Sequence, residues 1–161
     1  MLYQENAYRI LGVSADASVT MVRDAFQSLR TRIKVGSNIN IKDPLCSVCS
    51  LEQSESKIRD AFNRLMNPKT RLEERLLWFT KSLHTDEKAL ALLLSKDTEG
   101  AIRIWKSIQN HTSIANLTRL YHANCIYKDP DAEDCNLWEK TLGDWCTTIK
   151  SEGFWGGIYR N

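Results

Sequence analysis

Glycine and proline are scarce in this chain of 161 residues, which contains seven glycines and three prolines. Collagens and disordered linkers are far richer in both residues, so neither class fits. No apolar stretch approaches the roughly 18 residues that a membrane-spanning helix needs. The N-terminal decapeptide MLYQENAYRI has neither the basic nor the apolar region that secretory signals carry. We therefore expect a cytoplasmic protein that does not bind membranes.

The chain also has no large excess of positive or negative charge, because 22 basic residues oppose 20 acidic ones and leave a net charge of +2. Domains that bind nucleic acids are usually strongly basic, so this balance disfavours a nucleic-acid partner. Residues 1–85 carry 13 Lys and Arg against 9 Asp and Glu, whereas residues 86–161 carry 9 against 11. The first half of the chain is therefore mildly basic.

The five cysteines are an odd number in a chain long enough to build its own core: Cys46, Cys49, Cys125, Cys135 and Cys146. A disulfide framework is thus unnecessary, and reduced thiols are expected. Cys46 and Cys49 have the spacing of one zinc knuckle, but a closed structural zinc site needs four ligands. His122 and Cys125 could complete a set only if the loop folded back on the C-terminal helices. A redox pair is a further alternative, and unliganded loop cysteines are the preferred interpretation.

Apolar residues recur at intervals of three and four along the chain, which predicts an almost entirely helical protein. Four helices are expected in the first half, at residues 6–11, 19–36, 55–66 and 69–83. Gly12 is suited to end the first helix, and Ser18 and Ser54 are suited to cap the second and third. Asn67 and Pro68 interrupt the pattern, since proline fits the first turn of a new helix. Residues 37–53 have no helical pattern and predict a long loop.

The second half, residues 86–161, predicts a group of amphipathic helices after a linker around residues 84–86. Helices are expected to open at Asp97 or Thr98 and at Thr112 or Ser113. A last long helix places five apolar residues along one stripe: Leu137, Trp138, Leu142, Trp145 and Ile149. Two helices joined by a short turn resemble one tetratricopeptide-type hairpin, although no 34-residue period repeats.

The chain has five tryptophans, and four of them lie on expected apolar stripes: Trp78, Trp105, Trp138 and Trp145. We expect these four in the core. Phe154 and Trp155, near the C-terminal end, are the best candidates for an exposed apolar patch, because tryptophan is enriched in binding hot spots.

Three blocks of the first half resemble a J-domain, the helical module through which DnaJ-type cochaperones engage Hsp70. They are AYRILGVSADAS at residues 7–18, VRDAFQSLR at 22–30 and IRDAFNRLMNPKTRLEE at 58–74. The last block has Phe62, Leu65 and Arg71 in the pattern of the third J-domain helix. The chain is also similar to bacterial J-like proteins without the His-Pro-Asp motif, through these elements: Asn67, Pro68, Arg71, Leu72, Trp78, Phe79, residues 117–122, Trp138, Trp145, Phe154 and Trp155.

A working J-domain carries His-Pro-Asp directly after its second helix, and this chain has Lys34, Val35 and Gly36 at the matching positions. In the family that tripeptide couples docking to ATP hydrolysis by Hsp70, so the resemblance does not imply this activity. The second J-domain helix meets the acidic side of Hsp70 through a basic face. The candidate partner-binding residues here are therefore Arg23, Arg30, Arg32 and Lys34. A solvated basic helix face is the alternative.

Motifs for catalysis are missing: there is no Gly-rich phosphate loop, nucleophile elbow, paired-carboxylate pattern or His-Glu-x-x-His helix. His122 and Cys125 would lie close on one helix, but no third group is in view to orient them. We therefore expect no enzyme, and we assign no catalytic residue, metal ligand or cofactor.

The sequence thus predicts an all-α fold, with a J-domain-like helical hairpin in residues 1–83 packed with a C-terminal, tetratricopeptide-like helical bundle in residues 86–161. The expected function is that of a non-enzymatic adaptor or cochaperone-type protein. Its partner would be a protein, either Hsp70-like or of another kind. The chain would bind this partner without the stimulation of Hsp70 ATP hydrolysis that depends on His-Pro-Asp. The alternative is a zinc- or thiol-dependent protein that uses the Cys46 and Cys49 loop. The oligomeric state stays open.

Overall fold

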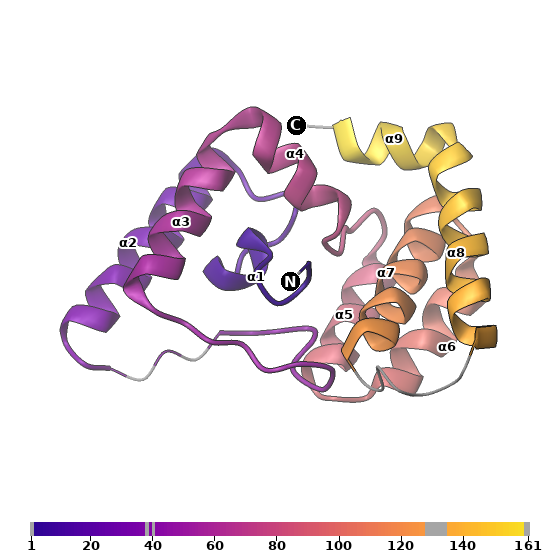
Figure 1. Ribbon diagram of the computed structural model, residues 1–161, viewed down its shortest axis with the longest axis horizontal. Coiled ribbons are helices and arrows are strands. Elements are labelled where there is room, and N and C mark those ends of the chain that lie inside the picture. The colour runs from indigo at the N-terminus through magenta and orange to yellow at the C-terminus, as the bar shows by residue number, and fades with distance from the viewer. Residues whose placement is uncertain (1, 38, 40, 128–134, 160–161) are drawn as a thin grey trace. The chain divides into compact units, whose positions relative to one another are not determined.

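The computed structural model of the protein describes residues 2–37, 39, 41–127 and 135–159 (Figure 1). Every regular element among these residues is an α-helix, which confirms the predicted all-α class. None of these helices is long and apolar enough to cross a bilayer. The chain forms two compact units, the first from Met1–Asp43 and Leu51–Phe79 and the second from Pro44–Ser50 and Thr80–Arg160. The sequence, in contrast, predicted a break near residues 84–86.

The first unit contains α1 (Ala7–Leu11), α2 (Val19–Lys34), α3 (Glu55–Met66) and α4 (Pro68–Leu76). The predicted caps are present: side chains of Ser18 and Ser54 accept hydrogen bonds from the backbone N–H groups of Met21 and Lys57, at 3.2 Å each. Gly12 ends α1 with a φ of 66°, a left-handed conformation that glycine adopts without strain. These local signals explain why the sequence located the first three helices.

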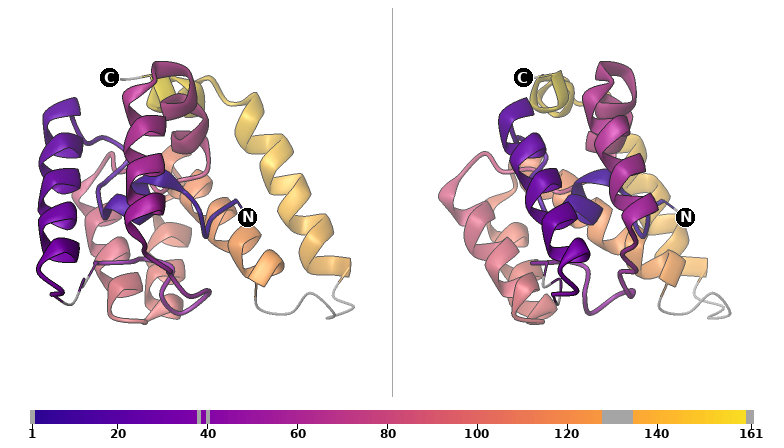
Figure 2. Two further views of the ribbon diagram at one scale, coloured as in Figure 1. Left: turned by 60° about the vertical axis from the view of Figure 1, so that its left-hand side comes forward. Right: turned by 90° about the vertical axis from the view of Figure 1, so that its left-hand side faces the viewer.

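Helices α2 and α3 lie side by side and run in opposite directions, and α1 packs against both (Figures 1 and 2). The rings of Phe26 in α2 and Phe62 in α3 stack with centroids 4.3 Å apart and planes 19° apart. Ile58 and Leu65 of α3 are fully buried with Val22 of α2. The hairpin is therefore held by an apolar seam that recurs at helical spacing.

The fourth helix ends at Leu76, so the prediction that it continues to residue 83 was wrong. Trp78 and Phe79 lie beyond it and are nonetheless buried. The next residue, Thr80, forms two hydrogen bonds with one side chain: its N–H donates to Asn116 Oδ1 at 3.1 Å, and Asn116 Nδ2 donates to its carbonyl at 2.8 Å. Thr80 lies outside any helix, so its N–H and carbonyl are available to Asn116, whereas a helix would use the same groups internally.

The second unit contains α5 (His84–Leu94), α6 (Thr98–Ile108), α7 (His111–Tyr127), α8 (Cys135–Lys150) and α9 (Glu152–Tyr159). Consecutive helices pack on one another, and α9 contacts both α7 and α8. Asp97 caps α6 as predicted, because its side chain accepts from the N–H of Gly100 at 2.8 Å. Helix α7 begins one or two residues before the prediction, because Asn110 accepts from the N–H of Ser113 at 2.8 Å.

The predicted linker at residues 84–86 is instead the first turn of α5, which corrects the sequence-based expectation. Asp86 is fully buried. Its Oδ2 accepts from the N–H groups of Ser82 and Leu83, at 3.0 and 2.9 Å, and its Oδ1 accepts from Trp105 Nε1 at 3.2 Å. Asp86 therefore closes the start of α5 and ties it to α6, which a flexible linker residue would not do.

The long loop has no helix among its described residues, as predicted. Its central stretch, Pro44–Ser50, belongs to the second unit although both flanks belong to the first. Leu45 is fully buried and Val48 nearly so. Ser47 Oγ lies 3.4 Å from Thr98 Oγ1, at the start of α6.

Helix α8 overturns the prediction that its apolar stripe is buried. Trp138, Leu142 and Ile149 are 37%, 57% and 45% exposed, and the residues of α8 that are buried are Thr141 and Thr148. Trp78 and Trp105 are buried as predicted. Phe154 was expected in an exposed patch but is buried, and the Arg119 guanidinium lies over its ring, 5.6 Å from the centroid.

Candidate partner-binding surface

The four basic residues singled out in the sequence all lie on α2. Arg23, Arg32 and Lys34 are exposed and Arg30 is half-buried. Since none of the four forms an ion pair with another residue in the described ranges, their charges are not neutralised within that part of the chain. Such charges are available to attract an acidic partner.

The helix brings only three of these residues together. Arg23, Arg30 and Lys34 are seven and four positions apart and fall within about 40° of one another around the helix axis. Arg32 falls about 180° from Arg23. The buried residues Val22 and Leu29 lie between the two flanks. We call Arg23, Arg30 and Lys34 the basic face of α2, and Arg32 lies on the opposite flank.

The end of α2 carries the three residues that replace His-Pro-Asp. Lys34 is its last helical residue, and Val35 is 68% exposed. Gly36 has a φ of 66°, so the chain turns away directly after the helix. A lysine, an exposed valine and a glycine offer one charge and no imidazole or carboxylate at this position.

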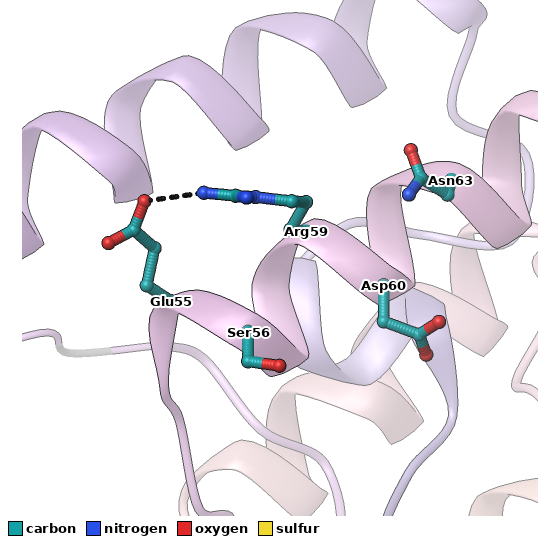
Figure 3. A pocket seen from close by; sticks show the side chains of 5 residues that line it. All are labelled: Glu55, Ser56, Arg59, Asp60 and Asn63. Carbon is teal, nitrogen blue, oxygen red and sulfur yellow. Dashed lines mark hydrogen bonds and ion pairs between the residues drawn. The ribbon is translucent and has the colours of Figure 1, made fainter.

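A second polar surface of the first unit lies on α3 (Figure 3). The residues lining this depression are Glu55, Ser56, Arg59, Asp60 and Asn63. Arg59 Nη2 donates to Glu55 Oε1 at 2.9 Å, and both side chains are largely exposed. All five residues come from one helix, and no other element among the described residues lines the depression. This arrangement is a solvated helix surface and offers no reaction centre.

The residues of the thiol and zinc alternative are not brought together in the part of the chain that the structure describes. Cys46 is exposed and Cys49 half-buried in the Pro44–Ser50 stretch, whereas Cys125 is buried with its sulfur 3.5 Å from Thr141 Oγ1. Within the described ranges no three His, Cys, Asp or Glu side chains are placed to hold a metal ion. The side chain of Cys135 lies outside the described residues.

His122, the histidine of the alternative zinc set, has an aromatic environment. Its ring centroid lies 6.0 Å from that of Trp138 and 5.8 Å from that of Trp145, with both pairs edge to face. Burial lowers the pKa of His122 below its ordinary value of 6.5, because the charged form loses hydration. The imidazole thus packs against two tryptophan rings of α8.

One polar pair escaped the sequence analysis. Ser151 Oγ lies 2.7 Å from His111 Nδ1, and the two residues are 40 positions apart. A serine and a histidine at this separation carry no local motif, so no sequence signal could have identified the pair. The His111 ring is exposed and lies against Gly153. The small cavity beside it measures about 10 Å³, which is too small for a substrate.

Comparisons of the chain with protein-family models, with curated proteins and with solved structures gave no match.

Proposed function

We propose that this protein is a non-enzymatic, J-domain-like interaction module that binds an Hsp70-like protein through the basic face of α2. The observation that carries the proposal is the positive charge of Arg23, Arg30 and Lys34 on one side of that helix. Arg23 and Lys34 are exposed, Arg30 is half-buried, and none of the three is ion-paired with another described residue. Charges of this kind steer an acidic partner and orient it during the encounter. The antiparallel packing of α2 on α3, with α1 against both, supports the J-domain-like assignment of the first unit.

The second unit supports a role in which the same chain offers a further helical scaffold. Helices α5 and α6 pack on each other and are joined by three residues, as in a single tetratricopeptide-like hairpin. Helical hairpins of this type are common protein-binding scaffolds and have no chemistry of their own.

The replacement of His-Pro-Asp makes the proposed module a binder that does not stimulate its partner. Lys34, Val35 and Gly36 supply neither the imidazole nor the carboxylate of the family motif. In a steady-state assay, addition of the protein at micromolar concentration is expected to leave the ATP turnover of Hsp70 unchanged. A several-fold stimulation would contradict this part of the proposal.

Binding itself is tested by titrating purified Hsp70 with the full chain and with charge-reversed variants, using isothermal titration calorimetry. We expect Arg30→Glu to weaken binding about tenfold, which corresponds to about 1.4 kcal/mol. Arg32→Glu is the matched control, because it makes the same charge change on the same helix but on the opposite flank. It should weaken binding much less than Arg30→Glu does.

The salt dependence of binding gives a second readout, since exposed charges are screened over about 8 Å at physiological ionic strength. Raising the salt concentration should weaken the wild-type complex and should affect the Arg30→Glu complex less. Thermal melts must show both variants folded. Failure of the wild-type chain to bind Hsp70, or equal losses for Arg30→Glu and Arg32→Glu, would overturn the proposed role of the basic face.

A further inference from the structure

Helix α8 presents a continuous apolar stripe on its outward side. The stripe consists of Trp138, Leu142, Trp145 and Ile149, which we call the α8 stripe. Leu142 is 57% exposed, Ile149 45% and Trp138 37%, and Trp145 is half-buried. Its members are separated by four, three and four positions, the spacing with which one helix packs along another.

The inward side of α8 is polar where a core helix is usually apolar. Thr148 Oγ1 lies 3.4 Å from Thr118 Oγ1, and Thr141 Oγ1 lies 3.5 Å from Cys125 Sγ. Both threonines are buried. The small hydroxyl residues therefore fix α8 against α7. Trp138 and Trp145 also contact His122 of α7 with part of their rings, and Leu142, Ile149 and the exposed part of Trp138 are left for another surface.

Charged residues beside the stripe indicate what covers it. Helix α8 contains Glu139, Lys140, Asp144 and Lys150, so its own charges balance. Glu139 and Lys150 lie on the same flank of the stripe, within about 20° of each other around the axis and about 16 Å apart along it. A single acidic and a single basic residue at opposite ends of one flank are self-complementary.

We propose that two copies of this chain associate by packing their α8 stripes antiparallel about a twofold axis. In this arrangement Glu139 of each copy lies next to Lys150 of the other, so one attraction occurs twice. In a parallel twofold pair, by contrast, this flank of one copy lies on the opposite side of the seam from the same flank of the other, so neither attraction forms. The charge pattern therefore favours a second copy packed in the antiparallel direction.

The size of the surface sets the strength of the association. A single helix pair buries less than the roughly 1,200 Å² of a standard interface, so the dimer is weak. Interfaces of standard size range from about picomolar to micromolar affinity, so we expect a dissociation constant of about 1 μM or weaker.

Sedimentation equilibrium from about 1 to 500 μM tests the proposal on the full chain. The wild-type protein should shift from monomer to dimer over this range, and Leu142→Glu should remain monomeric. Leu94→Glu is the matched control, because Leu94 is an exposed apolar residue on α5. It should leave the monomer–dimer equilibrium unchanged.

A charge exchange tests the direction of packing and does not depend on the apolar variants. Glu139→Lys should weaken the dimer about tenfold, and the double variant Glu139→Lys with Lys150→Glu should restore it. Neither change touches α2, so failure here leaves the Hsp70 proposal standing. A wild-type monomer at 500 μM, or a double variant as weak as the single one, would overturn the proposed self-association.

Discussion

Arg9 in α1 and Asp43 in the long loop form a buried, bidentate ion pair. Arg9 Nε donates to Asp43 Oδ1 at 2.9 Å, and Arg9 Nη2 donates to Asp43 Oδ2 at 2.6 Å. Their side chains are 0% and 6% exposed. Two parallel hydrogen bonds of this kind fix orientation as well as distance, so the pair holds the loop to the first helix.

Asp43→Ala should therefore lower the free energy of unfolding by about 3–5 kcal/mol, because it leaves the Arg9 guanidinium buried without its carboxylate. The double variant Arg9→Met with Asp43→Leu should cost less than Asp43→Ala alone, since it removes both charges. Urea denaturation measures each value. The exposed pair of Lys57 and Glu52 supplies the control, and Glu52→Gln should cost less than about 1 kcal/mol. Equal costs for the buried and exposed pairs would contradict the argument.

Asp86 is expected to be a second position of high sensitivity. Asp86→Asn should destabilise the chain by about 1–3 kcal/mol for each donor that it leaves without an acceptor. Asparagine has one acceptor oxygen where Asp86 uses both, for Leu83 and for Trp105. Chemical denaturation followed by far-UV circular dichroism measures the loss. Glu87→Gln, on the next residue and exposed, should change stability by no more than about 1 kcal/mol; a comparable loss there would show that any charge change at the start of α5 is harmful.

Two glycines of α9 should respond in opposite ways to alanine. Gly156→Ala should stabilise the chain by about 0.5–1 kcal/mol, because nothing lies within 4 Å of the added Cβ and alanine favours the helix. In Gly153→Ala the Cβ would overlap the His111 ring, so the ring must move and its hydrogen bond with Ser151 is lost. Thermal melts should show a loss of stability for Gly153→Ala, and His111→Ala should relieve it. Equal gains for both glycines would show that the ring moves without cost.

The lowered pKa of His122 predicts a loss of stability in acid. Above about pH 6.5 the imidazole is neutral in both the folded and the unfolded chain and contributes no pH dependence. As pH falls through 6.5, the unfolded chain binds a proton more readily than the folded one, so stability decreases. The loss levels off below the folded-state pKa.

Unfolding free energies between pH 8 and pH 5 measure this effect. His122→Leu should reduce the decrease, and His84→Gln, at an exposed histidine, should retain it. A decrease that is unchanged in His122→Leu would assign the acid sensitivity to other groups.

Local signals in the sequence were sufficient to locate most helices, because Ser18, Ser54 and Asp97 cap the helices that follow them. The end of α4 could not be predicted in this way. It depends on Asn116, which lies 36 positions after Thr80 and binds both its backbone groups. A stop signal supplied by a distant side chain leaves no trace in the local pattern.

The α8 stripe shows a different limit of the sequence. The periodicity located Trp138, Leu142 and Ile149 on one face, but periodicity alone does not say which face is covered. Thr141 and Thr148 are compatible with either side of a helix, and the structure places them inward. For α2, the spacing of Arg32 already separates it from Arg23, so that division could have been read from the helical repeat.

The Pro44–Ser50 stretch belongs to the second unit although the chain on both sides of it belongs to the first. This arrangement has a consequence for folding during synthesis on the ribosome. Residues 44–50 leave the ribosome before any helix of the second unit, against which they pack. Thr98, which Ser47 contacts, follows about 50 residues later. At typical elongation rates of about 5–20 residues per second this interval lasts several seconds. During that time Leu45 and Val48 are exposed, and a chain released at residue 79 would never bury them. The two units are therefore expected to mature together, and neither can be obtained by cutting the chain once.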